Sequence, residues 1–274
     1  IQTVVNISPT FGGINLEDIA APECFYIESE LKKRLSIPVF HDDQHGTAVI
    51  VAAGLINALE IQQKPMDQVK IVFLGAGAAG CSCARLLKLM GATDITMVDS
   101  KGILSNDRKN LNKYNQDLAI DTKGKTFNDA IQDADVFIGV SGANLLKNEH
   151  VKSMSKKPII FALANPDPEM LPSEAHAIRD DIVMATGRSD FDNQVNNVLG
   201  FPFLFKGALD AKAKQIDNDM LIAAANALAL LAKEPVPQSV LDAYDIGELS
   251  FGPNYIIPKP FDPRLIDWVA AAVR

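Results

Sequence analysis

The chain has 274 residues, 47% of them hydrophobic, and carries a formal net charge of −8 at pH 7. These values indicate one large or two modest domains with a substantial core. The acidic balance, without a basic cluster interleaved with aromatic residues, argues against a nucleic-acid partner. The longest apolar helix candidates, residues 47–59 and 220–232, are too short and too rich in alanine to span a membrane, so we expect no membrane association.

The beginning of the chain predicts a small α/β segment that ends in an acidic turn. An apolar run at residues 1–7 indicates a strand, and Pro22 opens a helix that ends in a basic run. A short strand at residues 37–40 follows, and Thr47 is placed to cap the long apolar helix after it. Residues 1–7 lack the basic flank and cleavage site of a secretory signal and resemble the interior of a protein, so we expect an N-terminally truncated chain.

A strand predicted at residues 70–74 runs into a glycine-rich turn, which is typical of the entrance to a dinucleotide site. Gly75 permits the tight turn, Gly77 lets the backbone approach a pyrophosphate, and Gly80 lets the next helix pack closely on the strand. Backbone N–H groups at the start of that helix would hold the phosphates. The alternative is a strand-to-helix turn without a ligand. The predicted cofactor-binding residues of the turn are Gly75, Ala76, Gly77, Ala78, Ala79 and Gly80.

The residues that follow the next strand bear on the choice of cofactor. An apolar run at residues 95–98 ends in Asp99, about 20 residues beyond the turn, where an acid meets the ribose hydroxyls of NAD. Ser100 and Lys101 would instead hold a 2′-phosphate and favour NADP. The sequence therefore predicts a nicotinamide dinucleotide and leaves both forms open at this point.

From residue 69 onward, predicted strands alternate with helices. The strands are residues 70–74, 95–98, 136–139, 158–162 and 182–185. This rhythm indicates an α/β fold with a doubly wound parallel sheet of the Rossmann type. Around the sheet we expect a surface excursion at residues 105–126, helices at 205–232 and 265–274, and an irregular proline-rich segment at 250–261.

Three cysteines, Cys24, Cys81 and Cys83, offer no disulfide framework and fit a reducing compartment. Cys81 and Cys83 fall in the helix after the glycine turn, where we expect them to be packing residues. A zinc site would need further ligands at suitable spacing, and the nearest histidines, His41 and His45, belong to another element.

Two acidic pairs precede the dinucleotide segment, Glu17 with Asp18 and Asp42 with Asp43. Carboxylates gathered in this way are typical of a Mg²⁺ or Mn²⁺ site, because both ions prefer oxygen ligands. The alternative is that these adjacent acids are solvated loop residues.

Polar side chains also follow several of the predicted strands. Ser141 and Asn165 come at the carboxyl ends of two strands, where ligands of open parallel sheets bind. Asn196 and Asn197 would offer amides to a carboxylate substrate, although such a pair more often forms a turn. Arg188 would pair with a substrate acid or with a surface carboxylate.

Together these motifs resemble the malic enzyme family, specifically the bacterial NADP-dependent type whose malic domain is often fused to a phosphotransacetylase-like domain. The resemblance covers essentially the whole chain. The motifs that carry it are residues 10–18, 38–48, 75–80, 164–166, 187–190, 194–198, 251–253 and 257–265.

The resemblance implies three parts. Residues 1–46 would be the C-terminal remainder of a smaller α/β malic domain that holds metal and substrate. Residues 47–205 would be the NAD(P)-binding domain, and residues 206–274 would be helices and a proline-rich tail packed on the domain interface. A homodimer or higher homo-oligomer in the cytoplasm is the expected state.

The implied activity is oxidative decarboxylation of L-malate to pyruvate and CO₂, with reduction of NADP or NAD. Glu17, Asp18 and Asp43 would bind Mg²⁺ or Mn²⁺, and Asp42 would support proton transfer beside them. Asn165 and Asn197 would contact the substrate or the nicotinamide end of the cofactor, and Ser141 would lie against the cofactor.

Malic enzymes also use a Tyr general acid and a Lys general base, and no position of this chain corresponds to either. We therefore expect a fragment that binds cofactor and metal but turns over malate poorly. Two alternatives remain open: an oxidoreductase similar to amino-acid or folate dehydrogenases that needs no metal, and a non-catalytic dinucleotide-binding module.

Overall fold

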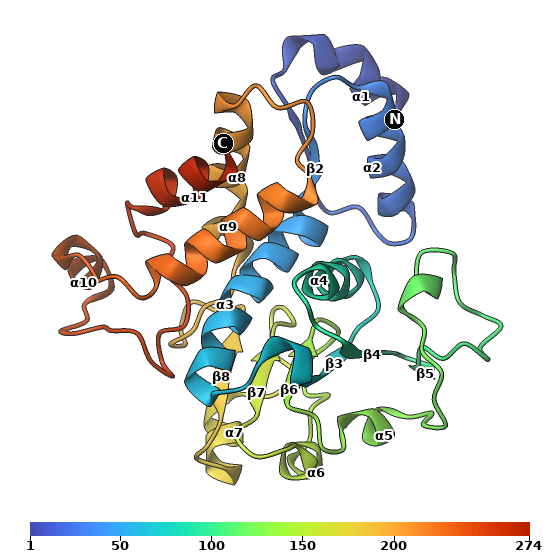
Figure 1. Cartoon of the computed structure of the whole chain (residues 1–274), viewed down its shortest axis with the longest axis vertical. Coiled ribbons are helices and arrows are strands. Elements are labelled where there is room, and N and C mark those ends of the chain that lie inside the picture. The colour runs from blue at the N-terminus through green and yellow to red at the C-terminus, as the bar shows by residue number, and fades with distance from the viewer.

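A computed structural model describes residues 1–274. The chain forms a large, mostly parallel sheet with helices on both faces and a two-stranded sheet beside it (Figure 1). The large sheet has the order β5-β4-β3-β6-β7-β8, and every pair is parallel except β4 with β5. This confirms the predicted α/β class and doubly wound, Rossmann-like sheet. Its strands are β3 (Lys70–Leu74), β4 (Asp94–Asp99), β5 (Gly102–Ile103), β6 (Val136–Gly139), β7 (Ile159–Ala162) and β8 (Val183–Thr186).

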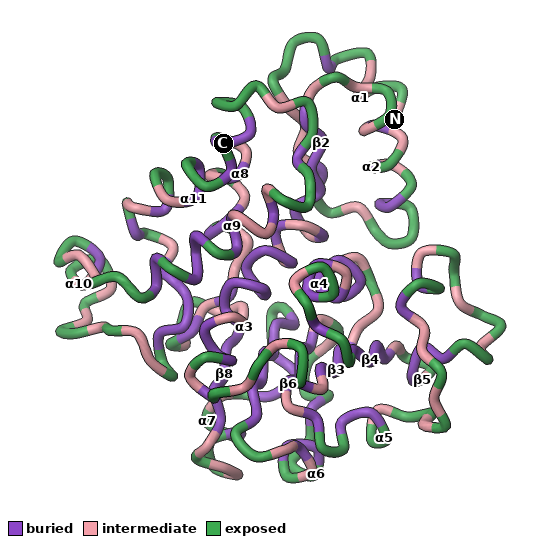
Figure 2. The backbone as a smooth tube through the Cα atoms, in the orientation of Figure 1, coloured by how far each residue is buried: buried purple, intermediate pink, exposed green.

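Side chains alternate between the two faces of this sheet, and each face has its own helices. Ile71 and Phe73 belong to a core of 47 buried residues, whereas Val72 and Leu74 belong to a core of 17 on the other side. Figure 2 shows the buried backbone running through the sheet and the long helix α3. The first core is closed by α3 (Thr47–Gln62), α4 (Ala78–Leu89), α8 (Phe201–Asp210), α9 (Asn218–Leu231) and α11 (Leu265–Val273). The second is closed by α5 (Phe127–Ile131), α6 (Asn148–Ser153) and α7 (Pro172–Ile178).

The residues before the large sheet include a smaller unit. β1 (Ile14–Leu16) pairs in parallel with β2 (Val39–His41), and the helices of the unit are α1 (Gln2–Ile7) and α2 (Glu23–Arg34). The strand predicted at residues 1–7 is wrong. Ile1, Val4 and Val5 have the spacing of one helical face, and they pack against the small cluster formed by Leu16, Leu31 and Val39.

A π-helical turn, Asp42–Gly46, joins β2 directly to α3. The capping role predicted for Thr47 is wrong, because Gly46 occupies the N-cap position and no side chain caps the helix. The Thr47 hydroxyl instead donates to Asn197 Oδ1 at 3.1 Å. The Thr47 N–H reaches back to the Asp42 carbonyl, so the acidic turn and α3 form one continuous unit.

The last part of the chain packs across the helices of the main core. The helical stretch predicted at 205–232 divides into α8 and α9, and an unpredicted short helix, α10 (Gln238–Tyr244), follows. The segment at 250–261 is irregular, as predicted, and it buries Tyr255, Ile256 and Ile257. The main core contains residues from all three predicted parts of the chain, from Cys24 to Val273. None of the helices combines the length and apolar character that crossing a membrane requires.

Asn57 fastens the irregular tail to the core. Its Nδ2 donates to the carbonyls of Ala229 and Ile256, both at 2.8 Å, and the residue is fully buried in α3.

We expect Asn57→Ala to lower the free energy of unfolding by about 2–4 kcal/mol, because two buried carbonyls lose their donor. Urea titration measures this loss. Asn148→Ala, at an exposed position of α6, is the matched control and should change the stability by less than about 0.5 kcal/mol. Equal stabilities of the two variants would contradict this role for Asn57.

Candidate cofactor and metal site

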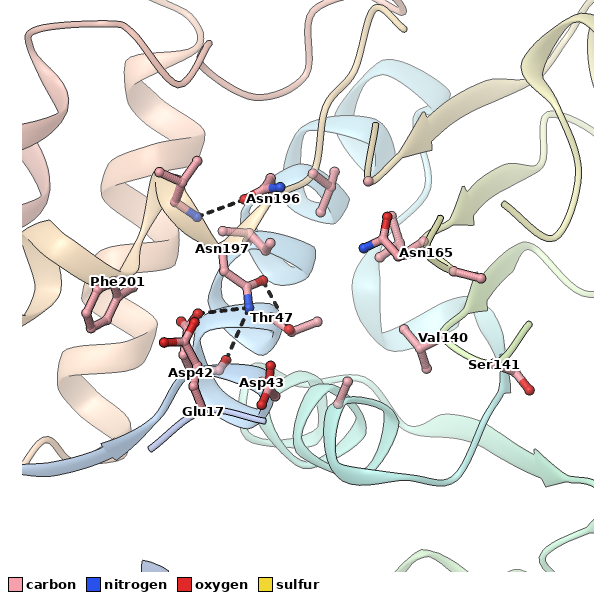
Figure 3. Close-up of a pocket in the computed structure, with 17 residues that line it drawn as sticks. Glu17, Asp42, Asp43, Thr47, Val140, Ser141, Asn165, Asn196, Asn197 and Phe201 are labelled. Carbon is pink, nitrogen blue, oxygen red and sulfur yellow. Dashed lines mark hydrogen bonds between the residues drawn. The ribbon is translucent and has the colours of Figure 1, made fainter. Parts of the chain in front are cut away.

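A pocket of about 540 Å³ lies between the acidic turn and the carboxyl ends of β6, β7 and β8 (Figure 3). It brings together side chains from parts of the chain that are far apart in sequence. Glu17, Asp42 and Asp43 form one wall, and Ser141, Asn165 and Asn197 also line it. The edge at which parallel strands end is where ligands of open α/β sheets bind.

The glycine turn next to this pocket has the geometry that a pyrophosphate needs. Gly75 has φ +122°, and a Cβ atom there would lie 2.7 Å from the Val140 carbonyl oxygen. A Cβ atom on Gly80 would lie 2.0 Å from the Gly75 carbonyl oxygen, whereas one on Gly77 would meet nothing within 4 Å. Helix α4 begins just after Gly77 without a side-chain cap, so its first N–H groups are available to an anion. Ala79, in the first turn of α4, lines the pocket.

Asp99 is the last residue of β4, in agreement with the prediction that the apolar run ends there, but its carboxylate is already paired. Arg108 donates to Asp99 Oδ1 at 2.9 Å and to Oδ2 at 2.7 Å, and the Lys101 N–H donates to Oδ1 at 2.8 Å. Burial raises the pKa of Asp99, but the contacts with Arg108 and Lys101 outweigh it and hold the pKa below its ordinary value. Arg108 was not predicted, because no local pattern marks it. The Lys101 side chain is exposed.

The two acidic pairs approach each other in the structure. The Asp18 N–H donates to Asp43 Oδ2 at 2.9 Å, which ties the loop after β1 to the acidic turn. Glu17 and Asp43 line the pocket, whereas Asp18 is exposed and lies outside the lining. Asp42, predicted as a supporting neighbour, is the most buried of the four, with 5% of its surface exposed.

The surroundings of Asp42 are unusual for a carboxylate. Its Oδ2 accepts a hydrogen bond from Asn197 Nδ2 at 3.2 Å, but its buried Oδ1 has no partner. Burial raises the pKa of Asp42 to about 6, and the charges of Glu17 and Asp43 act in the same direction against the Asn197 hydrogen bond. Crowded carboxylates of this kind are stabilised by a cation.

The donor chemistry of this wall fits a divalent cation. Glu17, Asp42 and Asp43 present carboxylate oxygens to one pocket, and these are the ligands that Mg²⁺ and Mn²⁺ prefer. No three acidic, histidine or cysteine side chains converge closely enough to form a ready coordination sphere. The structure therefore shows a carboxylate wall suited to a hard cation, in which the side chains stand farther apart than the ligands of a bound ion.

The three predicted amides, Asn165, Asn196 and Asn197, all line the pocket. Asn197 donates to Asp42 and accepts from Thr47, so it links the acidic turn to α8 through the 3₁₀ turn Asn197–Leu199. Asn196 accepts a hydrogen bond from the Val198 N–H and acts as the cap of that turn. Arg188 pairs with Asp190 at 2.7 Å and with Asp167 at 3.3 Å, which agrees with the surface alternative.

A buried acid behind the pocket was also missed. Glu169 is fully buried, and its carboxylate accepts hydrogen bonds from the N–H groups of Ser141 at 3.0 Å and Ala164 at 3.1 Å. Burial raises its pKa, against the effect of these hydrogen bonds. In the sequence it is one acid in a proline-rich loop, and nothing there marks it as buried.

Comparisons with known proteins show which proteins this chain is similar to. A family model described as "Malic enzyme, NAD binding domain" matches residues 44–244. The chain is 54% identical over its whole length to an NADP-dependent malic enzyme of Halomonas elongata and covers 65% of that protein. It is 53% identical to an NADP-dependent malic enzyme of Rhizobium meliloti and covers 36% of it.

Solved structures extend the similarity to the fold. An NAD-dependent malic enzyme of Thermotoga maritima has 41% sequence identity and a TM-score of 0.87, over 99% of this chain and 70% of that one. A malic enzyme of Pyrococcus horikoshii gives the same identity and TM-score, with 62% of that chain covered. The chain thus spans less than two thirds of the curated relatives described above.

Proposed function

Because the chain belongs to the malic enzyme family, we propose that it serves the metal-dependent oxidative decarboxylation of L-malate to pyruvate and CO₂, with NADP as the cofactor. The single observation that carries this proposal is the shared pocket. One cavity is lined by three carboxylates from the acidic elements and by residues at the carboxyl edge of the dinucleotide-binding sheet. A dehydrogenase without a metal has no need of that carboxylate wall.

The residues of the pocket divide the chemistry between them. Glu17 and Asp43 would hold Mg²⁺ or Mn²⁺, and the exposed Asp18 would need to turn inward to join them. When bound, the cation supplies a Lewis acid beside the malate oxygens, and the dinucleotide supplies the hydride acceptor. Asn165 would orient the substrate or the nicotinamide, and Asn197 holds the Asp42 carboxylate in place. Asp42, with its free buried oxygen, is placed to hold a proton near the substrate.

The preference for NADP is supported by the charges around Asp99. An unpaired carboxylate there would repel a 2′-phosphate, but Arg108 neutralises it through two hydrogen bonds. Lys101 adds an exposed cation two residues away. The relatives named above include NADP-dependent malic enzymes and the NAD-dependent enzyme of Thermotoga maritima, so this local charge balance is our reason for choosing NADP.

The proton-transfer pair is proposed to come from outside these 274 residues. The pocket lining contains neither a tyrosine nor a lysine, the residue types that the family resemblance implies as general acid and general base. We propose that the chain binds cofactor and metal and by itself turns over malate slowly.

We further propose a homo-oligomer and a cytoplasmic location. An apolar groove between α9 and α11, lined by Leu230 and Trp268, supports the first of these, because Leu230 is 55% exposed. Three free, buried cysteines support a reducing compartment.

Calorimetric titration of the 274-residue chain tests the proposed function. We expect NADP to bind more tightly than NAD, and L-malate to bind only when Mn²⁺ and the dinucleotide are present. Failure of both dinucleotides to bind would overturn the proposal. Malate binding that is indifferent to Mn²⁺ and to EDTA would favour a metal-free dehydrogenase. Turnover of about 10 s⁻¹, an ordinary enzyme rate, by this chain alone would contradict the external acid–base pair.

A further inference from the structure

Glu169 joins the two loops that form the sheet side of the pocket. The loop after β6 contributes Val140 and Ser141 to the lining, and the loop after β7 contributes Leu163, Ala164 and Asn165. Each oxygen of the Glu169 carboxylate accepts one backbone N–H, from Ser141 at 3.0 Å and from Ala164 at 3.1 Å. The carboxylate therefore bridges two adjacent strand ends at the place where both meet the pocket.

The fold leaves a specific space for this carboxylate. Gly139, the last residue of β6, lies directly against it, and a Cβ atom at that position would come within 2.3 Å of Glu169 Cδ. Two backbone hydrogen bonds fix the segment that carries the acid: the Leu146 N–H donates to the Glu169 carbonyl, and the Asn144 N–H donates to the Pro168 carbonyl, both at 3.1 Å. Glu169 has no exposed surface, so its side chain contacts neither solvent nor a molecule bound in the pocket.

The chemistry of the bridge requires a carboxylate. Both partners are N–H donors, so the bridging group must offer two acceptor atoms. A glutamine of the same shape keeps one oxygen and places an NH₂ group against the second N–H, which leaves a buried donor without a partner. Burying a carboxylate costs free energy. The hydrogen bonds that the Glu169 carboxylate makes to the two loops must offset this cost.

We propose that Glu169 is a positioning residue for the nicotinamide half of the dinucleotide, because it sets the separation of the loops that carry Ser141 and Asn165. This inference rests on the proposed function, since it assumes that a dinucleotide binds in the pocket. The adenosine half would instead meet the glycine turn and Asp99, which make no hydrogen bond to Glu169. Removing the bridge should therefore weaken one half of the cofactor site selectively.

The test compares two ligands by calorimetry, NADP and its adenosine half, 2′,5′-ADP. For Glu169→Gln we expect NADP to bind about tenfold more weakly and 2′,5′-ADP to bind within about twofold of wild type. Glu149→Gln, an exposed acid on α6 with the same change of charge, is the control and should alter neither affinity. Thermal unfolding shows whether the variants fold.

A second variant guards against a folding failure. Glu169→Asp keeps both acceptor oxygens and draws them back by one methylene, so it should show the same selective loss in smaller measure. Equal weakening of both ligands, or no weakening of NADP in a folded variant, would overturn the positioning role. Failure of wild type to bind either ligand would overturn the proposed function itself, so the two failures are distinguishable.

Discussion

The Asp43→Ala variant is expected to lose Mn²⁺ binding by about 100-fold or more, together with all Mn²⁺-dependent binding of malate. Asp43 is the acid with two roles: it lines the pocket, and its Oδ2 accepts the Asp18 N–H at 2.9 Å. Removing it deletes one proposed ligand and releases the loop that carries Glu17. Loss of an orienting partner alone typically costs 10–100-fold in metal affinity, so losing a ligand as well should exceed that range. Manganese binding is measured by electron paramagnetic resonance of the free ion.

The control for this variant is Asp94→Ala, which removes the same charge. Asp94 is exposed at the start of β4, at the amino ends of the strands, whereas the pocket lies at their carboxyl ends. We expect the Mn²⁺ affinity of this control to match that of wild type. If Asp43→Ala and Asp94→Ala bind Mn²⁺ equally, the carboxylate wall is not the metal site and the metal-dependent mechanism fails.

Alanine at two glycines of the same turn should affect two different properties: cofactor binding at Gly77 and stability at Gly80. At Gly77 nothing lies within 4 Å of an added Cβ, so Gly77→Ala should change the free energy of unfolding by less than about 0.5 kcal/mol. The new methyl group would nevertheless occupy the space that the pyrophosphate needs, and we expect NADP affinity to fall by roughly 100-fold.

Gly80→Ala is the matched comparison. Its Cβ would lie 2.0 Å from the Gly75 carbonyl oxygen, a backbone atom that cannot move without shifting α4 away from β3. We expect a loss of about 3 kcal/mol in the free energy of unfolding, measured by urea titration alongside NADP calorimetry. A folded Gly77→Ala variant with unchanged NADP affinity would show that the cofactor does not approach this turn.

The dinucleotide half of the site was predictable because its determinants are local. The strands predicted at 70–74 and 136–139 coincide with β3 and β6, and the glycine turn between β3 and α4 follows from the spacing of three glycines. Helix α1 was wrongly predicted as a strand, because its local pattern is ambiguous. A run of apolar residues seven positions long does not show which of them will face the core, and only packing against Leu31 distinguishes a helix from a strand there.

The contacts that complete the site were not predictable, because they join residues without a sequence pattern. Asn197 binds Asp42 across 155 positions, and Glu169 reaches Ser141 across 28. Arg108 is only nine positions from Asp99, yet the surface excursion at residues 105–126 to which it belongs offers several cations of equal promise. Tertiary geometry selects among such candidates, and a single sequence contains no record of that selection.

The shared core has a consequence for how the protein is made. Leu265, Val269 and Val273 of α11 are buried in the same core as α3, which carries the acidic turn at its start. Helix α11 packs on α8 and α9, so during synthesis the apolar surfaces of these two helices that it covers stay exposed until residues 265–273 have left the ribosome. Such contacts between distant parts of a chain slow folding and prolong the exposure of apolar surface. Chaperone demand for this core should consequently be highest just before α11 emerges.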